Sequence, residues 1–207
     1  MAYQPSMLEL THEAGPALGE LTPRRHPLSR GAWVDHLPGW VRGSDAVLRT
    51  LLEGVDWRAE RRRMYDGMVT VPRLLRWYDG HEPLPHPALA DARRALSAHY
   101  AGELGEPFVT AGMCLYRDGR DSVAWHGDTL GRSAHVDTMV AIVSFGSPRP
   151  LLLRPRGGGD SLRFPLGHGD LVVMGGSCQR TWEHCVPKTA RPVGPRISVQ
   201  FRPVGVA

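Results

Sequence analysis

The feature that most constrains the fold is a run of short apolar segments in the second half of the chain. From Phe108 onward these segments recur at short intervals, and glycine, proline and aspartate separate them. We expect strands over residues 108–116, 122–128, 138–146, 150–154, 161–166, 171–174 and 196–204. Seven or eight short strands at this spacing predict a barrel or a two-sheet jelly roll.

The first half of the chain is less regular. Segments 43–54 and 86–105 carry apolar residues at helical spacing, so each is predicted to form an amphipathic helix. Between them, Asp66-Gly67 indicates a hairpin turn, and Pro72 favours irregular strands or a flap. The 207 residues fit one ordinary domain. We expect a loosely ordered lead-in over 1–28, N-terminal helices and a lid over 29–107 within the same domain, and the β core over 108–207.

Composition sets limits on the cellular setting. The net charge of +4 is compatible with a polyanionic partner but does not identify one. Cys114, Cys178 and Cys185 lack the spacing of a disulfide or zinc framework, which favours a reducing, cytoplasmic environment. No segment approaches the roughly 20 apolar residues that cross a bilayer, and the N-terminus lacks the pattern of a signal peptide. We therefore expect no membrane association, and the sequence indicates no obligate protein partner.

A histidine two positions before an aspartate occurs three times. The three occurrences are His126-Gly127-Asp128, His135-Val136-Asp137 and His168-Gly169-Asp170. If 122–128 is a strand, the first pair shares one face, because side chains at i and i+2 align. His184, in "TWEHCVP", is a candidate third ligand from a distant strand. Two histidines and one carboxylate leave coordination positions open on a metal, as in non-heme iron(II) oxygenases.

Spacing alone leaves the choice among these pairs open. His168-Gly169-Asp170 has the composition of a tight turn between strands. His135-Val136-Asp137 precedes an apolar strand, where it could cap a loop, face water or serve as the ligand pair.

The C-terminal segment "RISVQFRPV" carries a second constellation. On a strand, Arg196 and Arg202 point the same way, together with Ser198 and Gln200. Two guanidinium groups on one short face suggest recognition of a carboxylate or phosphate. A solvated strand face is the alternative.

Taken together, these segments resemble a known family. The resemblance runs through "LYRDGRDSVAWHGD" (115–128), "VAIVSFG" (140–146), "LGHGDLVVMGGSCQRTWEHCVPK" (166–188) and "GPRISVQFR" (194–202), and extends less specifically to "VPRLLRWYDG" (71–80). The histidine–aspartate pair, the distal histidine and the paired arginines occur in the order typical of the AlkB-type iron(II)/2-oxoglutarate-dependent dioxygenases.

The resemblance implies a fold and a set of site residues. The fold is mainly β (α+β), a double-stranded β-helix or jelly roll with N-terminal helices and a substrate lid. His126, Asp128 and His184 are the implied iron ligands. Arg196 is implied to form a salt bridge with the distal carboxylate of 2-oxoglutarate. Tyr116 is implied to donate a hydrogen bond to this cosubstrate. Arg202 is implied to lie near the keto-acid end and Asp128, as part of the catalytic set.

The resemblance also implies an activity. Family members use Fe(II), 2-oxoglutarate and O2 to demethylate N-alkylated bases in DNA or RNA, which repairs alkylation damage. The base must be flipped or single-stranded to reach a buried metal. Candidate substrate contacts in the lid are Tyr65, Arg76, Trp77 and Tyr78. The alternative for the aromatic residues, and for Trp77 above all, is packing of the lid against the barrel. The alternatives are the same centre acting on a small metabolite or a protein side chain, and a non-catalytic metal-binding barrel.

The sequence departs from the family pattern at two places in the site. Cys114 stands where the family commonly has asparagine, which weakens or replaces one cosubstrate contact. Thr129-Leu130-Gly131 follows the first pair, where repair members usually carry an acidic residue against the flipped base. The sequence therefore does not identify the residue that recognises the base.

Overall fold

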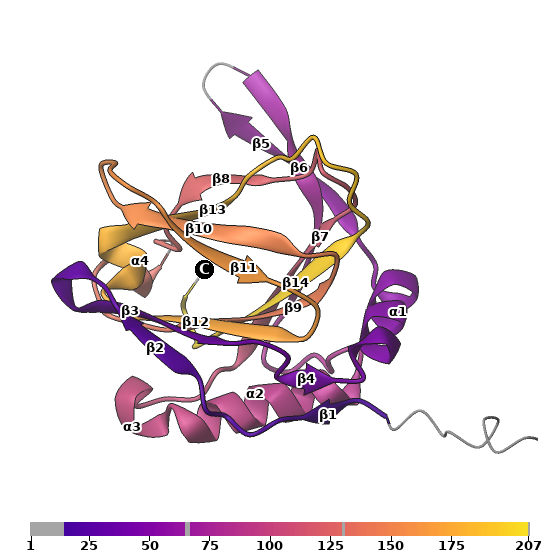
Figure 1. Ribbon diagram of the computed structural model, residues 1–207, viewed down its shortest axis with the longest axis horizontal. Helices are drawn as coiled ribbons and strands as arrows, with labels where there is room; N and C mark the ends of the chain where they lie inside the picture. The colour runs from indigo at the N-terminus through magenta and orange to yellow at the C-terminus, as the bar shows by residue number, and fades with distance from the viewer. Residues whose placement is uncertain (1–14, 65–66, 130, 207) are drawn as a thin grey trace, which may run out of the picture.

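Two antiparallel β-sheets face each other in the computed structural model, which describes residues 15–64, 67–129 and 131–206 (Figure 1). The smaller sheet consists of β8 (Val123–His126), β10 (Arg149–Pro155), β11 (Leu162–Leu166) and β13 (Trp182–Val186). The larger sheet consists of β2 (Arg24–Pro27), β3 (Ala32–Leu37), β5 (Arg58–Met64), β6 (Gly67–Tyr78), β7 (Thr110–Tyr116), β9 (Val140–Gly146), β12 (Asp170–Gly176) and β14 (Arg196–Arg202). Their strand orders are β11-β10-β13-β8 and β2-β3-β12-β9-β14-β7-β6-β5. The predicted jelly-roll class is confirmed.

Short elements complete the domain. β1 (Ala17–Leu18) pairs with β4 (Val41–Arg42). The helices are α1 (Ser44–Gly54), α2 (Pro87–His99), α3 (Ala101–Leu104) and α4 (Cys178–Thr181), with 3-10 turns at Ser29–Gly31 and Arg132–Ala134. None of the helices in the described part of the chain combines the length and the apolar character needed to cross a membrane.

The central strands of the larger sheet are buried on both faces. On β9, Ile142 packs between the two sheets, whereas Val143 and Phe145 pack on the opposite face. Helices α1 and α2 cover that opposite face through apolar side chains that include Leu51 and Leu96 (Figure 1). Successive side chains of a β-strand point to opposite faces of the sheet, so a single strand contributes residues to both cores.

Both predicted helices form, with one difference. α1 matches the expected 43–54 segment, but the 86–105 segment is divided into α2 and α3 at Tyr100. The ring of Tyr100 is fully buried, and its hydroxyl donates to Asp35 Oδ2 at 2.9 Å. Gly105, in the left-handed conformation, ends α3.

β5 and β6 form the hairpin that the sequence predicts between the helices, although Asp66 lies outside the described residues. The hairpin projects beyond the body of the barrel next to β8 (Figure 1). Its pairing is interrupted between Ala59 and Arg61. Pro72 lies opposite this interruption, and its carbonyl accepts a hydrogen bond from the Ser122 amide at 2.8 Å. A proline cannot donate to the ladder, which gives this irregularity a local cause.

Residues 15–28 differ from the loosely ordered lead-in expected over 1–28. β2 pairs with β3 at the edge of the larger sheet. Arg25 donates to both carboxylate oxygens of the buried Asp35 at 2.8 Å. Hydropathy does not reveal that a strand is paired or that two side chains form an ion pair. The composition of this segment therefore led us to expect a loosely ordered lead-in. Residues 1–14 lie outside the described part of the chain.

Candidate metal and cosubstrate site

The three residues implied as iron ligands lie together at one end of the smaller sheet. His126 is the last residue of β8, and His184 lies directly opposite it on β13. The centroids of their rings are 4.3 Å apart. Potential ligand atoms of His126, Asp128 and His184 all lie within 4.8 Å of one another. One ion can therefore contact all three side chains.

Asp128 reaches this cluster by a route that the sequence did not predict. We expected it on the same strand face as His126, but β8 ends at His126 and Asp128 lies in the following loop. The Asp128 amide donates to Gln179 Oε1 at 3.0 Å, which ties the loop to α4. Gly127 allows this approach, because a Cβ there would lie 2.4 Å from the backbone oxygen of Gln179.

The charges of the cluster suit metal binding. Arg202 donates through Nε and a terminal nitrogen to Asp128 Oδ2 at 2.9 and 2.6 Å, while Oδ1 lies 3.6 Å from His126 Nε2. Burial alone would raise the pKa of Asp128, but Arg202 and the two histidines hold that pKa well below its usual range. Burial lowers the pKa of His184 to about 3, so its imidazole is neutral near pH 7. A carboxylate and a neutral imidazole are the forms that bind metals.

His126 also has a suitable orientation. Its Nδ1 lies 2.9 Å from the carbonyl oxygen of Ala124. When Nδ1–H donates to that carbonyl, the Nε2 lone pair is left free to face the cluster.

The other two histidine–aspartate pairs lie elsewhere. Asp137 forms an ion pair with Arg180 at the surface, with Nε 3.0 Å from Oδ1. His168-Gly169-Asp170 is the turn that the sequence predicted, and Gly169 has a φ of 82°. Asp170 accepts hydrogen bonds from the amides of Gly39 and Gly167 at 2.7 and 2.6 Å, so its carboxylate has a structural role.

The ligand cluster opens into a cavity of about 750 Å³ between the sheets. β14 contributes its alternate residues to the cavity wall: Arg196, Ser198, Gln200 and Arg202. The intervening apolar residues of β14 pack in the core on the other face. Every residue of β14 is buried, so the alternative of a solvated strand face is wrong.

Arg196 and Tyr116 line a part of this cavity that is suited to an anion. Arg196 is 1% exposed, and its Nε donates to Ser144 Oγ at 2.9 Å. One of its terminal nitrogens is buried without a partner among the described residues, and burial lowers the pKa of Arg196. A buried, incompletely paired guanidinium is stabilised by an anion. Burial raises the pKa of Tyr116 to about 12, so its phenol remains protonated and can donate to that anion.

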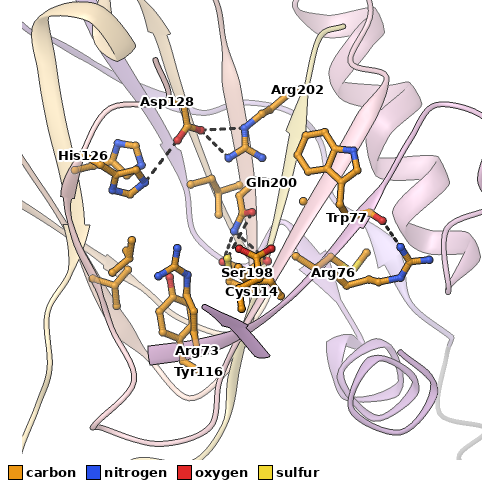
Figure 2. A pocket seen from close by; sticks show the side chains of 18 of the residues that line it. Arg73, Arg76, Trp77, Cys114, Tyr116, His126, Asp128, Ser198, Gln200 and Arg202 are labelled. Atoms are coloured by element: carbon orange, nitrogen blue, oxygen red, sulfur yellow. Dashed lines mark hydrogen bonds and ion pairs between the residues drawn. The ribbon is translucent and has the colours of Figure 1, made fainter. Parts of the chain in front are cut away.

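The wall and the ligand cluster fit a dicarboxylic cosubstrate beside a metal. Figure 2 shows Asp128 between His126 and Arg202, with Tyr116, Ser198 and Gln200 further along the same cavity. The two-histidine, one-carboxylate donor set suits iron(II), and the guanidinium with an unsatisfied nitrogen suits a carboxylate.

The predicted substrate contacts that the structure describes lie in two environments, the cavity and the core. Trp77 lines the cavity, is 41% exposed, and has its ring centroid 5.8 Å from the Arg202 guanidinium carbon. Arg76 also lines the cavity, but its guanidinium donates to the Trp77 carbonyl (Figure 2). It also pairs with Glu82. Tyr78 is 5% exposed in the core on the other face of the sheet, so its expected substrate contact is corrected. Strand alternation separates Tyr78 from Trp77. Tyr65 lies outside the described residues.

Gln179, which contacts the ligand loop, and Glu60, which lines the cavity, were not identified as site residues from the sequence. Gln179 follows no recognisable motif, and nothing in its neighbourhood signals that its side chain meets Asp128. Glu60 lines the cavity from β5. Cys114 lines it from β7, with Sγ 3.9 Å from Gln200 Oε1, a weak contact where the family commonly has an amide.

Comparisons with known proteins agree with this geometry. The family model of the 2OG-Fe(II) oxygenase superfamily matches residues 42–202. Human alpha-ketoglutarate-dependent dioxygenase alkB homolog 3 is 32% identical over 189 residues, which cover 81% of this chain and 64% of that protein. Human DNA oxidative demethylase ALKBH2 is 31% identical over 114 residues, covering 51% of this chain and 43% of that protein. The chain thus spans less than two thirds of the length of these curated relatives.

Solved structures give the same fold at lower sequence identity. The structure of OsALKBH1 superposes with a TM-score of 0.59 and 16% identity, covering 86% of this chain and 99% of that chain. A prolyl hydroxylase from Trichoplax adhaerens, solved with a hypoxia inducible factor peptide fragment, gives a TM-score of 0.59 at 14% identity, covering 82% and 83%. These similarities support the jelly roll, and the AlkB-type resemblance is confirmed by the sequence relatives.

Proposed function

Because the chain belongs to the 2OG-Fe(II) oxygenase superfamily, we propose that it is a dioxygenase that oxidatively demethylates N-alkylated bases in DNA or RNA. The observation that carries the proposal is the convergence of His126, Asp128 and His184 within 4.8 Å beside the buried Arg196. The names of the relatives, alkB homolog 3 and DNA oxidative demethylase, support a nucleic-acid substrate over a metabolite or protein side chain.

Different residues of the chain bind the metal and the cosubstrate in such a reaction. His126, Asp128 and His184 hold the metal, and Arg202 fixes the Asp128 carboxylate from the side away from His126. Arg196 and Tyr116 bind the distal carboxylate of 2-oxoglutarate. When bound, iron(II) and 2-oxoglutarate supply the activation of O2 that oxidises a substrate C–H bond, with release of succinate and CO2.

The substrate chemistry follows from the carbon that is oxidised. Insertion of one oxygen atom into an N-methyl C–H bond gives an N-hydroxymethyl group. The C–N bond then breaks: the nitrogen keeps the bonding electron pair, the hydroxyl group gives up its proton, and the carbon leaves as formaldehyde. The cavity admits a base only when the base is unstacked, and the exposed ring of Trp77 at its wall is suited to stacking on that base.

The setting we propose is cytoplasmic. Cys114, Cys178 and Cys185 are all free thiols in the structure. Free, mostly buried cysteines are compatible with a reducing compartment.

The test is turnover of 2-oxoglutarate to succinate with iron(II) and methylated oligonucleotides. We expect formaldehyde and succinate in equal amounts with 1-methyladenine or 3-methylcytosine, and little with the unmethylated strand. Asp128→Ala should abolish both iron binding and turnover, whereas Asp137→Ala should keep both. Turnover that no nucleic acid stimulates would contradict the nucleic-acid substrate, and loss of iron binding in Asp137→Ala would contradict the ligand set.

A further inference from the structure

Three residues on neighbouring strands form one row across the inner face of the larger sheet. Tyr116 on β7 pairs directly with Arg196 on β14. On the other side of β7, Leu74 of β6 pairs with Leu115, so the preceding residue of β6, Arg73, lies beside Tyr116 in the same register. All three members of the row line the cavity. Because neighbouring strands are about 5 Å apart, Tyr116 has an arginine on each side, and the two arginines begin about 10 Å apart.

Arg73 has a hydrogen-bond donor that the described part of the protein leaves unused. The residue is half-buried, and one terminal nitrogen donates to the Ser122 carbonyl at 3.2 Å, which fixes the guanidinium inside the cavity. Glu60 on β5 interacts with it electrostatically. Its Nε is nevertheless buried without a hydrogen-bond partner among the described residues, as is one terminal nitrogen of Arg196. Two arginines in one row therefore each offer a donor to a bound group.

A weak hydrogen-bonding residue occupies the adjacent row. Cys114 lies between Leu75 of β6 and Ser198 of β14. Figure 2 shows Cys114 and Ser198 in the same part of the cavity as Arg73. A thiol is a poor donor, and Sγ lies 3.9 Å from Gln200 Oε1. The Arg73 guanidinium is close enough to Cys114 to interact with it, so it can donate to a carboxylate that the thiol binds only weakly.

We propose that Arg73 is a second arginine that binds 2-oxoglutarate: it holds the distal carboxylate from the opposite side of Tyr116 to Arg196, and it supplies the donor that Cys114 lacks. A carboxylate has two oxygen atoms, so each guanidinium can bind one of them. The inference rests on the proposed role of Arg196 in cosubstrate binding, and it is independent of which substrate is oxidised.

The test measures the Kd of the iron(II)-loaded protein, under anaerobic conditions, for 2-oxoglutarate and for 2-oxopentanoate, which lacks the distal carboxylate. Arg73→Met should weaken binding of 2-oxoglutarate about tenfold or more and leave that of 2-oxopentanoate within about twofold, because only the first ligand has a carboxylate at the arginine. Arg73→Lys keeps the charge but loses the fork of donors, so its Kd should lie between those of the wild type and Arg73→Met. Arg58→Gln is the matched control, since it removes a cation from the same cavity wall at an exposed position paired with Asp56, and it should bind both ligands like the wild type.

Cys114→Asn gives a second readout that general damage to the site would not reproduce. Asparagine places an amide donor in the adjacent row. The double variant Arg73→Met/Cys114→Asn should therefore bind 2-oxoglutarate about threefold or more tightly than Arg73→Met, whereas Cys114→Asn alone should gain less over the wild type. Absence of any recovery in the double variant would show that Arg73 does not replace an amide at this wall.

The outcomes separate this inference from the proposed function. If Arg73→Met binds 2-oxoglutarate like the wild type, weakens both ligands equally, or weakens only the binding of an oligonucleotide, Arg73 does not hold the distal carboxylate and the inference is wrong, while the proposed function stands. If the wild type itself binds 2-oxoglutarate no more tightly than 2-oxopentanoate, the anion-binding role of Arg196 fails, and the proposed function fails with it.

Discussion

Replacement of Gln179 by leucine should weaken iron binding although Gln179 touches no metal. Gln179 is 1% exposed, and its Oε1 accepts the Asp128 amide at 3.0 Å. Leucine has a similar volume but no acceptor, so the amide of a buried ligand loop loses its partner. A buried donor without a partner costs about 1–3 kcal/mol.

This cost can lower either the free energy of unfolding or the affinity for iron. If the loop keeps its position, the free energy of unfolding of the metal-free protein falls. If the loop moves so that its amide meets water, Asp128 leaves the cluster, and metal affinity falls by about 10–100-fold, the range typical of residues that orient ligands. The decreases in unfolding free energy and in iron-binding free energy should together amount to about 1–3 kcal/mol.

The assay is an anaerobic iron(II) titration combined with denaturant unfolding of the metal-free protein. Arg180→Gln is the control, since it lies on the same short helix and loses only a surface ion pair with Asp137. Arg180→Gln should be close to the wild type in both measurements. If Gln179→Leu also matches the wild type in both, the hydrogen bond to Asp128 does not position the ligand, and the reasoning is refuted.

Three further results are expected. Arg196→Gln should raise the KM for 2-oxoglutarate about tenfold or more, whereas the exposed Arg191→Gln should not; equal effects would remove the anion-binding role. Gly127→Ala should lose iron affinity, because its Cβ would lie 2.4 Å from a backbone oxygen of α4, while Gly102→Ala meets nothing within 4 Å and should bind iron normally. Asp170→Ala should lower the free energy of unfolding by about 2 kcal/mol or more, because two amides lose their acceptor, with iron affinity retained. Loss of iron from Asp170→Ala at a temperature where it is folded would contradict its structural assignment.

The jelly roll was predictable because its signal is periodic and local. Short apolar runs with glycine and proline turns mark strands whatever their partners are, and most of the expected strands formed near their expected bounds. His184 was expected on a distant strand, but the bounds of β13 were not predicted, because "TWEHCV" has few of the cues that mark a strand. β2 and β3 were missed for a similar reason, since tertiary pairing and the Arg25–Asp35 contact stabilise them.

The site was predictable in its members more than in its geometry. The cluster of His126, Asp128 and His184, whose ligand atoms the structure brings within 4.8 Å of one another, was expected from residue types in a family order, yet the strand argument for Asp128 was wrong. Its position depends on Gln179, more than 50 residues later in the chain, and no local pattern encodes such a contact. For Tyr78, a local pattern was available but was not applied. Successive side chains of a strand point to opposite faces, which places Trp77 in the cavity and Tyr78 in the core.

Arg202 connects the metal cluster to the substrate side of the cavity. Its guanidinium holds Asp128 Oδ2 through two hydrogen bonds and lies 5.8 Å from the ring of Trp77. Gly112 on β7 makes this proximity possible, because a Cβ there would lie 2.9 Å from Arg202 and 3.3 Å from Trp77. A base stacked on Trp77 would therefore lie close to the cation that orients the metal ligand. The arginine that keeps Asp128 ionised therefore also adds positive charge to the cavity wall beside Trp77, so a change at Arg202 should affect both the metal ligand and this part of the cavity.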